Sequence, residues 1–413
     1  MKSLERMDRM EVEIVRLNHT GDGVGKINGK IVFVKKTLPG DIVTLKNIVE
    51  KKSYFLADKE KYLARSPLSI EAKCPYYDEC GGCQIMTLPY QEQLNYKKNK
   101  VIDIFKKYTS LEINPEIIAS PKIFNYRNKI TLQVENGKIG FYHYKTNQLI
   151  PIKSCPLAKE RTNEIINLLS EISESKFLTN VNQIIIKEFQ EKIMIQIKGK
   201  VEEKDLISIL KDKVSSIYIN NKLVYGKAKL TETLGSYHYS ISPNSFFQVN
   251  KEQTIHLYQQ VKKYLMPNQN NVLDLYCGMA SIGIYVSDIV QNVTGIELNP
   301  SSVKDALENI QENHLTNIKV REGDVGKLLD EKNTYDAIIV DPPRSGLDKN
   351  TKAGLLKIKS KKIIYVSCNP ITLARDIQEL KEEYELKEIT LFDLFPNTYH
   401  LETVVLLKRR KPL

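Results

Sequence analysis

Cys368 lies in the part of this chain that most favours chemistry. It belongs to a Ser-Cys-Asn-Pro sequence at 367–370, directly after an apolar run at 363–366 that predicts a buried strand. Open α/β sheets bind ligands at the carboxyl ends of their strands. Glu402, in a His-Leu-Glu sequence at 400–402, is a candidate base. A single cysteine is most often an inert core residue, but a thiol and a base beside the cofactor motifs described next predict covalent catalysis.

A second group of residues predicts a cofactor site at the ends of preceding strands. The sequence Asp-Leu-Tyr-Cys-Gly at 274–278 closes one strand, Ser281 follows, and Glu297 ends the next strand, 19 residues after Gly278. Glycine allows close approach of the backbone to a ligand, and an acidic residue there can accept hydrogen bonds from ribose hydroxyls. The glycine pattern departs from G-x-G-x-x-G, and no basic cradle for a pyrophosphate follows. We therefore expect S-adenosylmethionine, which has no phosphate, rather than a nicotinamide dinucleotide.

The residues after the fourth strand indicate which kind of atom accepts a methyl group. Asp341 begins an Asp-Pro-Pro sequence, which in methyltransferases of exocyclic amines tends to be followed by a stacking aromatic residue, whereas Arg344 follows here. A carbon target is therefore expected. Carbon 5 of uracil is a weak nucleophile, but addition of the Cys368 thiolate to carbon 6 makes it enolate-like, and Glu402 can then remove the proton on carbon 5. Asp341 is expected to hydrogen-bond the uracil edge.

Four other cysteines have the spacing of metal ligands. Cys74, Cys80 and Cys83 form a C-x5-C-x2-C pattern around two glycines, and Cys155 precedes a proline far along the chain. Three clustered thiolates with one distant thiolate are a common way to hold a 4Fe-4S cluster. Zinc is the main rival, although sites with four thiolates more often use paired C-x2-C knuckles. The spacing favours a 4Fe-4S cluster that braces an accessory domain.

Three domains are expected to position these residues. Short apolar runs between Gly and Pro-Gly turns predict a small OB-like β-barrel that binds RNA at 1–66. A central α+β domain with the cluster is expected at 67–245, and a Rossmann-like α/β class I methyltransferase domain at 246–413. The latter is predicted as a doubly wound parallel sheet with helices between most strands. Its candidate strands are 272–275, 293–296, 318–320, 337–340, 363–366 and 386–391, followed by a late strand at 403–407.

The charge is concentrated at one end of the chain. The net charge is +11, and residues 1–153 carry 26 Lys and Arg against 17 Asp and Glu, which leaves 35 against 33 in the remainder. A basic excess in accessory regions is what a phosphate backbone attracts, although a solvated surface would give the same count. No apolar run is long enough for a membrane span, and the first residues lack the apolar core of a signal peptide. A cytoplasmic location without membrane contact is expected.

The chain resembles the RNA uracil-5-methyltransferases, in particular the iron–sulfur 23S ribosomal RNA branch with an N-terminal TRAM domain. The resemblance covers nearly the whole chain. It rests on the cysteines above and on the motifs at 246–250, 274–278, 341–346, 367–370 and 400–402. It implies Cys368 as nucleophile and Glu402 as base, and a helix near 88–118 that packs on the catalytic domain. The cofactor contacts that it implies are Gln248, Tyr276, Ser281, Glu297, Asp324 and Asp341.

Two positions depart from the commonest form of the family, because Tyr276 replaces a frequent Phe and Ser281 a frequent Asn. Fine cofactor contacts are affected by these changes, but the reaction is not. Two alternatives stay open: a transfer RNA substrate, and a non-catalytic RNA-binding iron–sulfur protein. The intact pair of Cys368 and Glu402 disfavours the second. A monomer is expected, and the sequence does not identify the target uridine.

Overall fold

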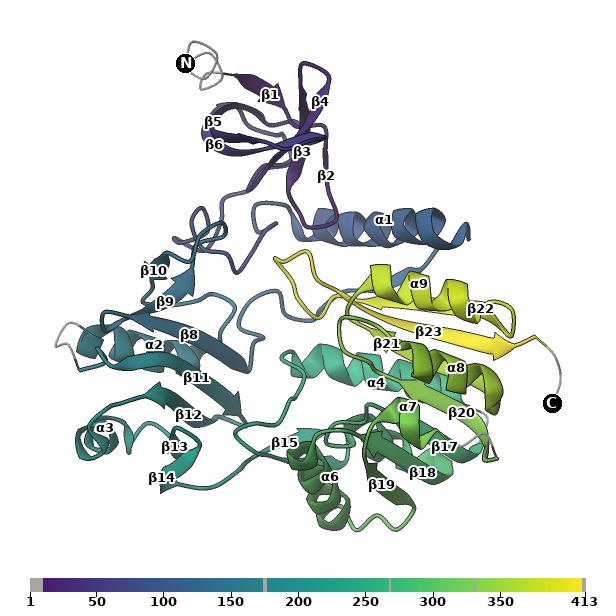
Figure 1. Cartoon of the computed structure of the whole chain (residues 1–413). Helices are drawn as coiled ribbons and strands as arrows, with labels where there is room; N and C mark the ends of the chain where they lie inside the picture. The colour runs from purple at the N-terminus through teal and green to yellow at the C-terminus, as the bar shows by residue number, and fades with distance from the viewer. Residues whose placement is uncertain (1–9, 174–176, 267–268, 330–331, 411–413) are drawn as a thin grey trace. The chain divides into compact units, whose positions relative to one another are not determined.

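The computed structural model of the chain describes residues 10–173, 177–266, 269–329 and 332–410 (Figure 1). The expected first and last domains extend into residues 1–9 and 411–413, which lie outside this range. The chain divides into two compact units. Unit 1 comprises Met1–Lys100, Phe141–Ile150 and Phe395–His400, and unit 2 comprises Val101–Gly140, Pro151–Leu394 and Leu401–Leu413. No helix in the described ranges is long and apolar enough to span a bilayer.

Unit 1 contains the predicted small β-domain as a six-stranded sheet. Its strands are β1 (Glu11–Glu13), β2 (Arg16–Leu17), β3 (Gly23–Ile27), β4 (Lys30–Val34), β5 (Ile42–Glu50) and β6 (Tyr54–Ala64), in the order β1-β5-β6-β4-β3-β2. Inward residues such as Ile14, Val32 and Leu45 are fully buried and form one core. Asn28 and Gly29 both have positive φ and form the two-residue hairpin between β3 and β4, a turn that such residues favour.

The cysteine-rich loop of unit 1 is bonded to the six-stranded sheet. Lys36, which follows β4, is buried and donates from Nζ to the carbonyl oxygens of Cys80, at 3.1 Å, and Cys83. The same ammonium lies 4.0 Å from the centre of the Tyr77 ring. Asp58 of β6 accepts a hydrogen bond of 3.0 Å from the Tyr144 hydroxyl in the segment Phe141–Ile150. These contacts join the sheet, the loop and that segment within one unit.

A seven-stranded sheet is formed by residues between the two ends of the chain. Its strand order is β10-β9-β8-β11-β12-β13-β14. The strands are β8 (Lys129–Glu135), β9 (Lys138–Tyr142), β10 (Leu149–Pro151), β11 (Val181–Phe189), β12 (Lys192–Gly199), β13 (Ser216–Ile219) and β14 (Lys222–Gly226). Helices α2 (Glu160–Ser173) and α3 (Glu203–Leu210) accompany it, and a hairpin of β15 (Leu230–Leu234) and β16 (Tyr237–Ile241) follows. This arrangement is the predicted α+β pattern.

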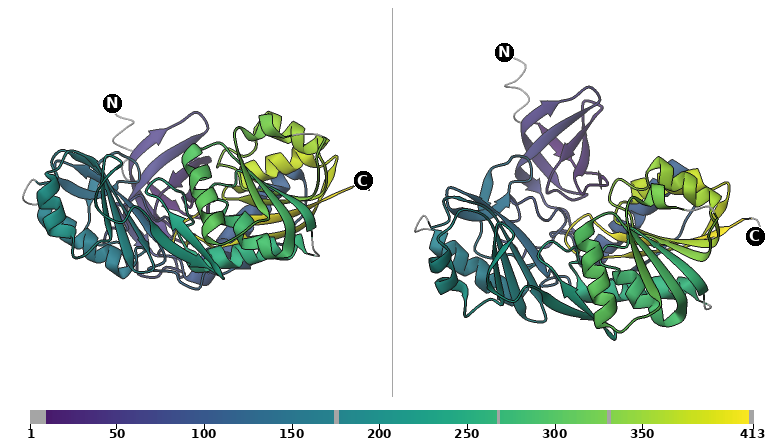
Figure 2. Two further views of the ribbon diagram at one scale, coloured as in Figure 1. Left: turned by 90° about the horizontal axis from the view of Figure 1, so that it is seen from below. Right: turned by 60° about the horizontal axis from the view of Figure 1, so that its bottom comes forward.

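An eight-stranded sheet in unit 2 has helices along both faces (Figures 1 and 2). The strand order is β19-β18-β17-β20-β21-β23-β22-β7. The strands are β7 (Glu116–Ile118), β17 (Gln269–Leu275), β18 (Val290–Glu297), β19 (Ile318–Glu322), β20 (Thr334–Val340), β21 (Lys359–Ser367), β22 (Tyr384–Phe392) and β23 (Glu402–Arg409). The strand order changes direction between β17 and β20, since the chain passes from β17 to β18 and β19 on one side and then to β20 on the other. Doubly wound sheets bind ligands at such a switch point.

The sheet is mixed, so the expectation of a parallel sheet was wrong at one strand. β23 lies between β21 and β22 and is antiparallel to both. The reason is the short connection from Phe392 to Glu402, because a parallel return needs a crossover of about a dozen residues or more. This reversal decides which end of β23 lies at the ligand-binding edge.

The helices pack on the two faces of this sheet. On one face are α4 (Lys251–Leu265), α5 (Ser281–Val286) and α6 (Pro300–Glu312); on the other are α7 (Val325–Leu328), α8 (Lys349–Lys357) and α9 (Pro370–Leu380). Helix α1 (Tyr90–Thr109) runs from unit 1 into unit 2. Its residues Val101, Ile104 and Phe105 belong to the same apolar core as α7, α8 and α9. The last turns of α1 thus share a core with these helices, and the helix ends at Thr109, because Glu116–Ile118 forms strand β7.

Candidate active site

The ends of four parallel strands meet at one edge of the eight-stranded sheet. Tyr276, Asp341 and Cys368 each follow the last residue of a strand, β17, β20 and β21 respectively, and Glu297 is the last residue of β18. The ladders pair Leu275 with Ile296 and with Val340, so these strand ends are level. Residues that are far apart in the chain are thereby gathered along one edge.

Glu402 reaches this edge because β23 is antiparallel. Ser367, the last residue of β21, pairs with Thr403, the second residue of β23. Cys368 and Glu402 therefore leave neighbouring strands at the same end. The Glu402 side chain is only 4% exposed, whereas Cys368 is partly buried. The two predicted catalytic residues are brought together within electrostatic reach of each other.

The charge around Cys368 keeps its thiol protonated in the protein alone. Burial raises the thiol pKa to about 11, and the neighbouring carboxyl groups of Glu402 and Asp341 add to the rise. Arg344, an exposed side chain, opposes them, because its guanidinium carries positive charge near the sulfur. A thiolate, not a thiol, is the nucleophile. Arg344 is thus the group in this site that favours the reactive form.

Three carboxyl groups of the site are raised in pKa by their burial. Asp274, the penultimate residue of β17, has a pKa of about 8 because of burial and the nearby charges of Asp341 and Glu297. Burial raises the pKa of Asp341 to about 7. Burial and Asp341 raise the pKa of Glu402 well above its usual value, against the effect of Arg344. One Asp274 oxygen accepts from the backbone N–H of Gly283 at 3.2 Å, and the other has no partner among the described residues.

Glu297 and Tyr276 have fixed places in the turn after β17. The Glu297 carboxylate accepts from the backbone N–H groups of Gly278, at 2.9 Å, and Asn299, at 2.7 Å. A carboxylate has about four acceptor positions, so it can still accept from a ribose. Tyr276 has a positive φ, and its hydroxyl bonds Asp348 at 3.2 Å, at the start of α8.

Two of the other predicted cofactor residues, Ser281 and Asp324, follow strands β17 and β19 of the same sheet, whereas Gln248 contacts the residue before β8. Ser281 begins α5, and its hydroxyl lies 2.7 Å from that of the buried Tyr258. Asp324 caps the start of α7 by accepting from the backbone N–H of Lys327 at 3.1 Å. Gln248 precedes α4, and its carbonyl oxygen accepts from the side chain of Asn128 at 2.9 Å. The roles of these residues in cofactor binding stay predictions.

The residues present fit S-adenosylmethionine. A Cβ added at Gly278 would meet nothing within 4 Å, and the residue has a positive φ, so its backbone faces open space. The buried carboxyl groups of Asp274 and Glu402 and the partly buried carboxyl of Asp341 lie within electrostatic reach of one another, and together they suit a ligand with positive charge. S-adenosylmethionine brings a sulfonium and an ammonium group.

The predicted metal site is not shown in the part of the chain that the structure describes. Among the described residues, no group of three or more His, Cys, Asp or Glu side chains is arranged to hold a metal ion. Cys74, Cys80 and Cys83 belong to unit 1, whereas Cys155 belongs to unit 2. All four are thiols rather than disulfide partners, and the Cys80 sulfur accepts from the backbone N–H of Gly82 at 3.3 Å.

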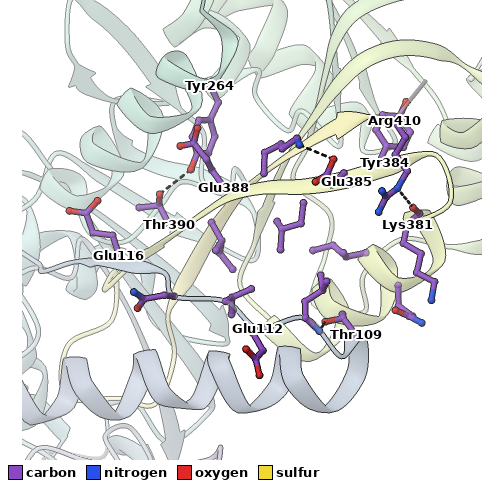
Figure 3. Close-up of a pocket in the computed structure, with 18 residues that line it drawn as sticks. Thr109, Glu112, Glu116, Tyr264, Lys381, Tyr384, Glu385, Glu388, Thr390 and Arg410 are labelled. Carbon is purple, nitrogen blue, oxygen red and sulfur yellow. Dashed lines mark hydrogen bonds and ion pairs between the residues drawn. The ribbon is translucent and has the colours of Figure 1, made fainter. Parts of the chain in front are cut away.

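A separate cavity of about 590 Å³ opens beside β22 (Figure 3). Its wall includes Thr109, Glu116, Tyr264, Lys381 and Glu388, and the Tyr264 hydroxyl lies 3.0 Å from that of Thr390. None of the residues predicted for catalysis or cofactor binding lines it. The cavity is therefore distinct from the candidate active site.

Sequence reasoning assigned no role to two residues that the structure places in the site. In the sequence, Arg344 indicates only that the target is not an amine, whereas in the structure its positive charge lies near the Cys368 sulfur. Asp274 begins a motif in the sequence, and in the structure its carboxyl is 1% exposed and has one oxygen without a partner among the described residues. The signal for both was present, because each lies in a motif that ends a strand of the sheet.

The fold and this edge define a class I methyltransferase that uses S-adenosylmethionine. Residues 89–324 and 325–410 match the family described as tRNA (Uracil-5-)-methyltransferase, and residues 4–56 match the TRAM domain. The chain belongs to this family of RNA uracil-5-methyltransferases. It carries the family's N-terminal TRAM domain, so RNA is its substrate and the non-catalytic alternative is not favoured.

Relatives and a solved structure agree with this assignment. Proteins from Bacillus cereus and Aquifex aeolicus, each described as an uncharacterized RNA methyltransferase, are 32% and 33% identical to the chain. The alignment with the Bacillus cereus protein covers 98% of this chain and 98% of the relative. The alignment with the Aquifex aeolicus protein covers 97% of this chain and 98% of the relative. The crystal structure of Pyrococcus abyssi tRNA (uracil-54, C5)-methyltransferase with S-adenosyl-L-homocysteine is similar at a TM-score of 0.80 and 29% identity. It covers 96% of this chain and 100% of its own.

Proposed function

We propose that the protein methylates carbon 5 of a specific uridine in 23S ribosomal RNA, with Cys368 as nucleophile and Glu402 as base. The observation that supports this mechanism is the pairing of Ser367 with Thr403, since it sets a thiol and a buried carboxyl side by side at the ligand edge. A nucleophile and a base on one face of a ring are what methylation of carbon 5 requires.

In the proposed reaction the Cys368 thiol first loses its proton and the sulfur bonds to carbon 6 of the uracil. Arg344 favours the thiolate through its positive charge. Addition turns carbon 5 into an enolate-like nucleophile, and Asp341, beside the site, stabilises the polarised uracil edge. S-adenosylmethionine, held at Glu297 and the turn at 276–278, supplies an electrophilic methyl group.

Glu402 completes the proposed cycle by accepting the proton that carbon 5 still carries. As that proton leaves, its bonding electrons re-form the double bond and the bond from carbon 6 to sulfur breaks, which returns the Cys368 thiolate. Burial gives the Glu402 carboxylate a high proton affinity, which suits removal of a proton from carbon. The products are a 5-methyluridine, the demethylated cofactor and one proton.

Transfer RNA is the second candidate substrate. The Pyrococcus abyssi structure that matches nearly the whole chain is that of an enzyme described as acting on uracil 54 of tRNA. The choice of ribosomal RNA as the first candidate substrate rests on the cysteine pattern and the accessory domain, which resemble those of the 23S branch. Both substrates require the uridine to leave its stack before its ring can reach Cys368.

A 4Fe-4S cluster on Cys74, Cys80, Cys83 and Cys155 is part of the proposal, and it is supported by the spacing of the cysteines and by the Gly82 N–H bond to sulfur. No catalytic step is assigned to it. Anaerobically purified protein is expected to contain iron and acid-labile sulfide. Zinc without sulfide would instead identify a thiolate zinc site.

The test is mass spectrometry of nucleosides after incubation of the protein with S-adenosylmethionine and unmodified 23S or transfer RNA. Wild-type protein should form 5-methyluridine in ribosomal RNA, and Cys368→Ala should not. Product in transfer RNA alone would replace the substrate assignment but leave the mechanism intact. Wild-type protein that yields no 5-methyluridine from either RNA would refute the proposed function.

A further inference from the structure

The loop that carries Arg344 is bonded to the helix that follows Cys368. The side-chain amide of Asn369 donates to the carbonyl oxygen of Arg344 at 3.0 Å. The Thr372 hydroxyl shares its one proton between the carbonyl oxygens of Asn369, at 3.1 Å, and Arg344, at 3.3 Å. Asn369 is also the N-cap of α9, where its oxygen accepts from the backbone N–H of Ile371 at 3.1 Å. Both donors therefore lie within one helical turn of the nucleophile.

A second tie fixes the far end of the same loop. Asp376, in the next turn of α9, accepts from the backbone N–H of Leu347 at 2.8 Å and from the hydroxyl of Tyr365 at 2.7 Å, both at one carboxylate oxygen. Its other oxygen lies 3.5 Å from the Lys352 ammonium. Tyr365 belongs to β21, three residues before Cys368. The loop is thus joined to the helix and the strand on either side of the thiol.

Gly346 shows how closely this loop approaches α9. It has a φ of +81°, and an added Cβ would lie 2.6 Å from an Asp376 oxygen and 3.0 Å from the Thr372 Cβ. Thr372 is 5% exposed and Asp376 is 4% exposed. Neither side chain therefore faces solvent, and the loop can move away from α9 only if buried hydrogen bonds break.

We propose that Thr372, Asn369 and Asp376 are positioning residues that hold the Arg344 guanidinium against the Cys368 sulfur. The inference rests on the proposed role of Cys368, and it adds that α9 sets the reactivity of the thiol. The three residues act through Arg344 and touch no reacting atom. Their hydrogen bonds join the loop at 344–347 to α9 and its N-cap, directly after the nucleophile. The cation can stay near the nucleophile only while this loop stays against the helix.

The charges around the sulfur make this placement matter. Glu402 of β23 and Asp341 after β20 both face the thiol and disfavour the thiolate, and Arg344 is the cation among the groups that act on it. The interaction of two charges falls with their distance, so the guanidinium favours the thiolate only while it stays near the sulfur. If the loop moves from α9, the thiol pKa rises and less thiolate forms at a given pH.

The experiment measures alkylation of Cys368 by iodoacetamide in the full-length protein, followed by peptide mass spectrometry across a range of pH. Thr372→Val removes the hydroxyl with little change of volume, and Thr372→Ser restores it. Thr109→Val is the matched control, because the Thr109 hydroxyl is also buried and bonds a helix carbonyl, that of Phe105, at 2.6 Å. Tyr365→Phe is a second variant that acts through Asp376.

Thr372→Val should alkylate at Cys368 about threefold to tenfold more slowly near pH 8, with its profile shifted to higher pH, because one pKa unit is a tenfold change in thiolate. Thr372→Ser and Thr109→Val should follow wild type. The alkylation profile of Tyr365→Phe should shift in the same direction as that of Thr372→Val. The proposal can therefore be tested with Tyr365→Phe even if the Thr372→Val protein folds poorly. The maximal turnover rate should fall in both shifted variants, with the KM for the cofactor unchanged.

Profiles of Thr372→Val and Tyr365→Phe that coincide with wild type would overturn the proposal. Because alkylation needs no RNA and no methyl transfer, the profile can shift even if the protein makes no 5-methyluridine. Failure of the proposed function is therefore distinguishable from failure of this inference.

Discussion

Ser367 and Thr403 face each other in an antiparallel ladder, and this pairing sets Cys368 beside Glu402 at the ligand edge of the sheet. The relationship depends on β23 lying between β21 and β22. A parallel β23 would carry its first residue to the opposite edge of the sheet. The antiparallel direction of β23 therefore places the proposed base beside the proposed nucleophile.

Loss of the proposed base should stop the reaction after methyl transfer. In Glu402→Gln the amide cannot accept the proton from carbon 5, so the covalent complex with RNA should accumulate and turnover should fall by about 10² to 10⁴. Denaturing gel electrophoresis of labelled RNA measures the complex. Glu388→Gln, an exposed change on β22, is the control and should turn over like wild type. A Glu402→Gln protein with normal turnover would exclude this role.

Removal of the cation beside the nucleophile should raise the thiol pKa above its value of about 11. In Arg344→Gln, burial and the charge of Glu402 act without opposition, and each rise of the pKa by one lowers the thiolate fraction near pH 8 about tenfold. The rate of Cys368 alkylation against pH measures this change. Arg344→Lys keeps the charge but loses the planar fork, so its profile should lie between those of wild type and Arg344→Gln. Equal profiles for wild type and Arg344→Gln would contradict the assignment.

Cofactor preference should depend on pH. The carboxyl groups of Asp341 and Asp274, with pKa values of about 7 and about 8, ionise as the pH rises, and ionised carboxylates favour the more positive ligand. S-adenosylmethionine carries one more positive charge than S-adenosylhomocysteine. Its affinity relative to that product should therefore rise by about tenfold between about pH 6 and about pH 9, as calorimetry can show. A constant ratio would count against the carboxyl groups as the charge-sensing part of the site.

Asp274→Asn should stabilise the protein without ligand at alkaline pH. The folded pKa of Asp274 is about 8, above its unfolded value, so its favourable contribution exists at low pH and is lost as the pH rises through the folded pKa. The amide avoids this loss, and the free energy of unfolding should increase by on the order of a few kcal/mol near pH 9. Urea titrations at several pH values test the change. The exposed Asp212→Asn serves as the control, and an Asp274→Asn gain that is equal at all pH values would be inconsistent with the cause given.

Lys187 should stabilise the segment before the motif at 246–250. This buried side chain of β11 donates from Nζ to the carbonyl oxygens of Ser242 at 3.1 Å, Pro243 at 2.7 Å and Ser245 at 3.0 Å. Pro243 keeps the Gln196 donor, and Ser242 keeps the backbone N–H of Ser245 at 3.3 Å, so among the described residues Lys187→Met leaves the Ser245 carbonyl oxygen without a donor. The free energy of unfolding should fall by about 2–4 kcal/mol.

Denaturant unfolding measures the effect of Lys187→Met, and Lys192→Met is the matched control on the neighbouring strand. Lys192 is exposed, so its replacement should change the free energy of unfolding by less than about 0.5 kcal/mol. A Lys187→Met protein as stable as wild type would mean that the segment holds its conformation without the ammonium group.

Local signals in the sequence predict which candidate site residues lie at strand ends. An apolar run followed by Cys368, and another that ends at Glu297, place each residue at a strand end without knowledge of the rest of the fold. The place of Glu402 was expected only at the rim of a late strand, because the direction of β23 depends on its neighbours. Sequence could not reveal Asp376 as a partner of Leu347, since that contact joins a helix to a distant loop.

The most direct test of the central claim is covalent trapping of the protein on RNA that contains 5-fluorouridine, with S-adenosylmethionine present. Fluorine on carbon 5 cannot leave as a proton, so Glu402 cannot complete the reaction and the bond from sulfur to carbon 6 should persist. Peptide mass spectrometry should find the nucleotide on Cys368 in wild type and no adduct in Cys368→Ala. An adduct on another residue, or trapping that survives in Cys368→Ala, would contradict the account.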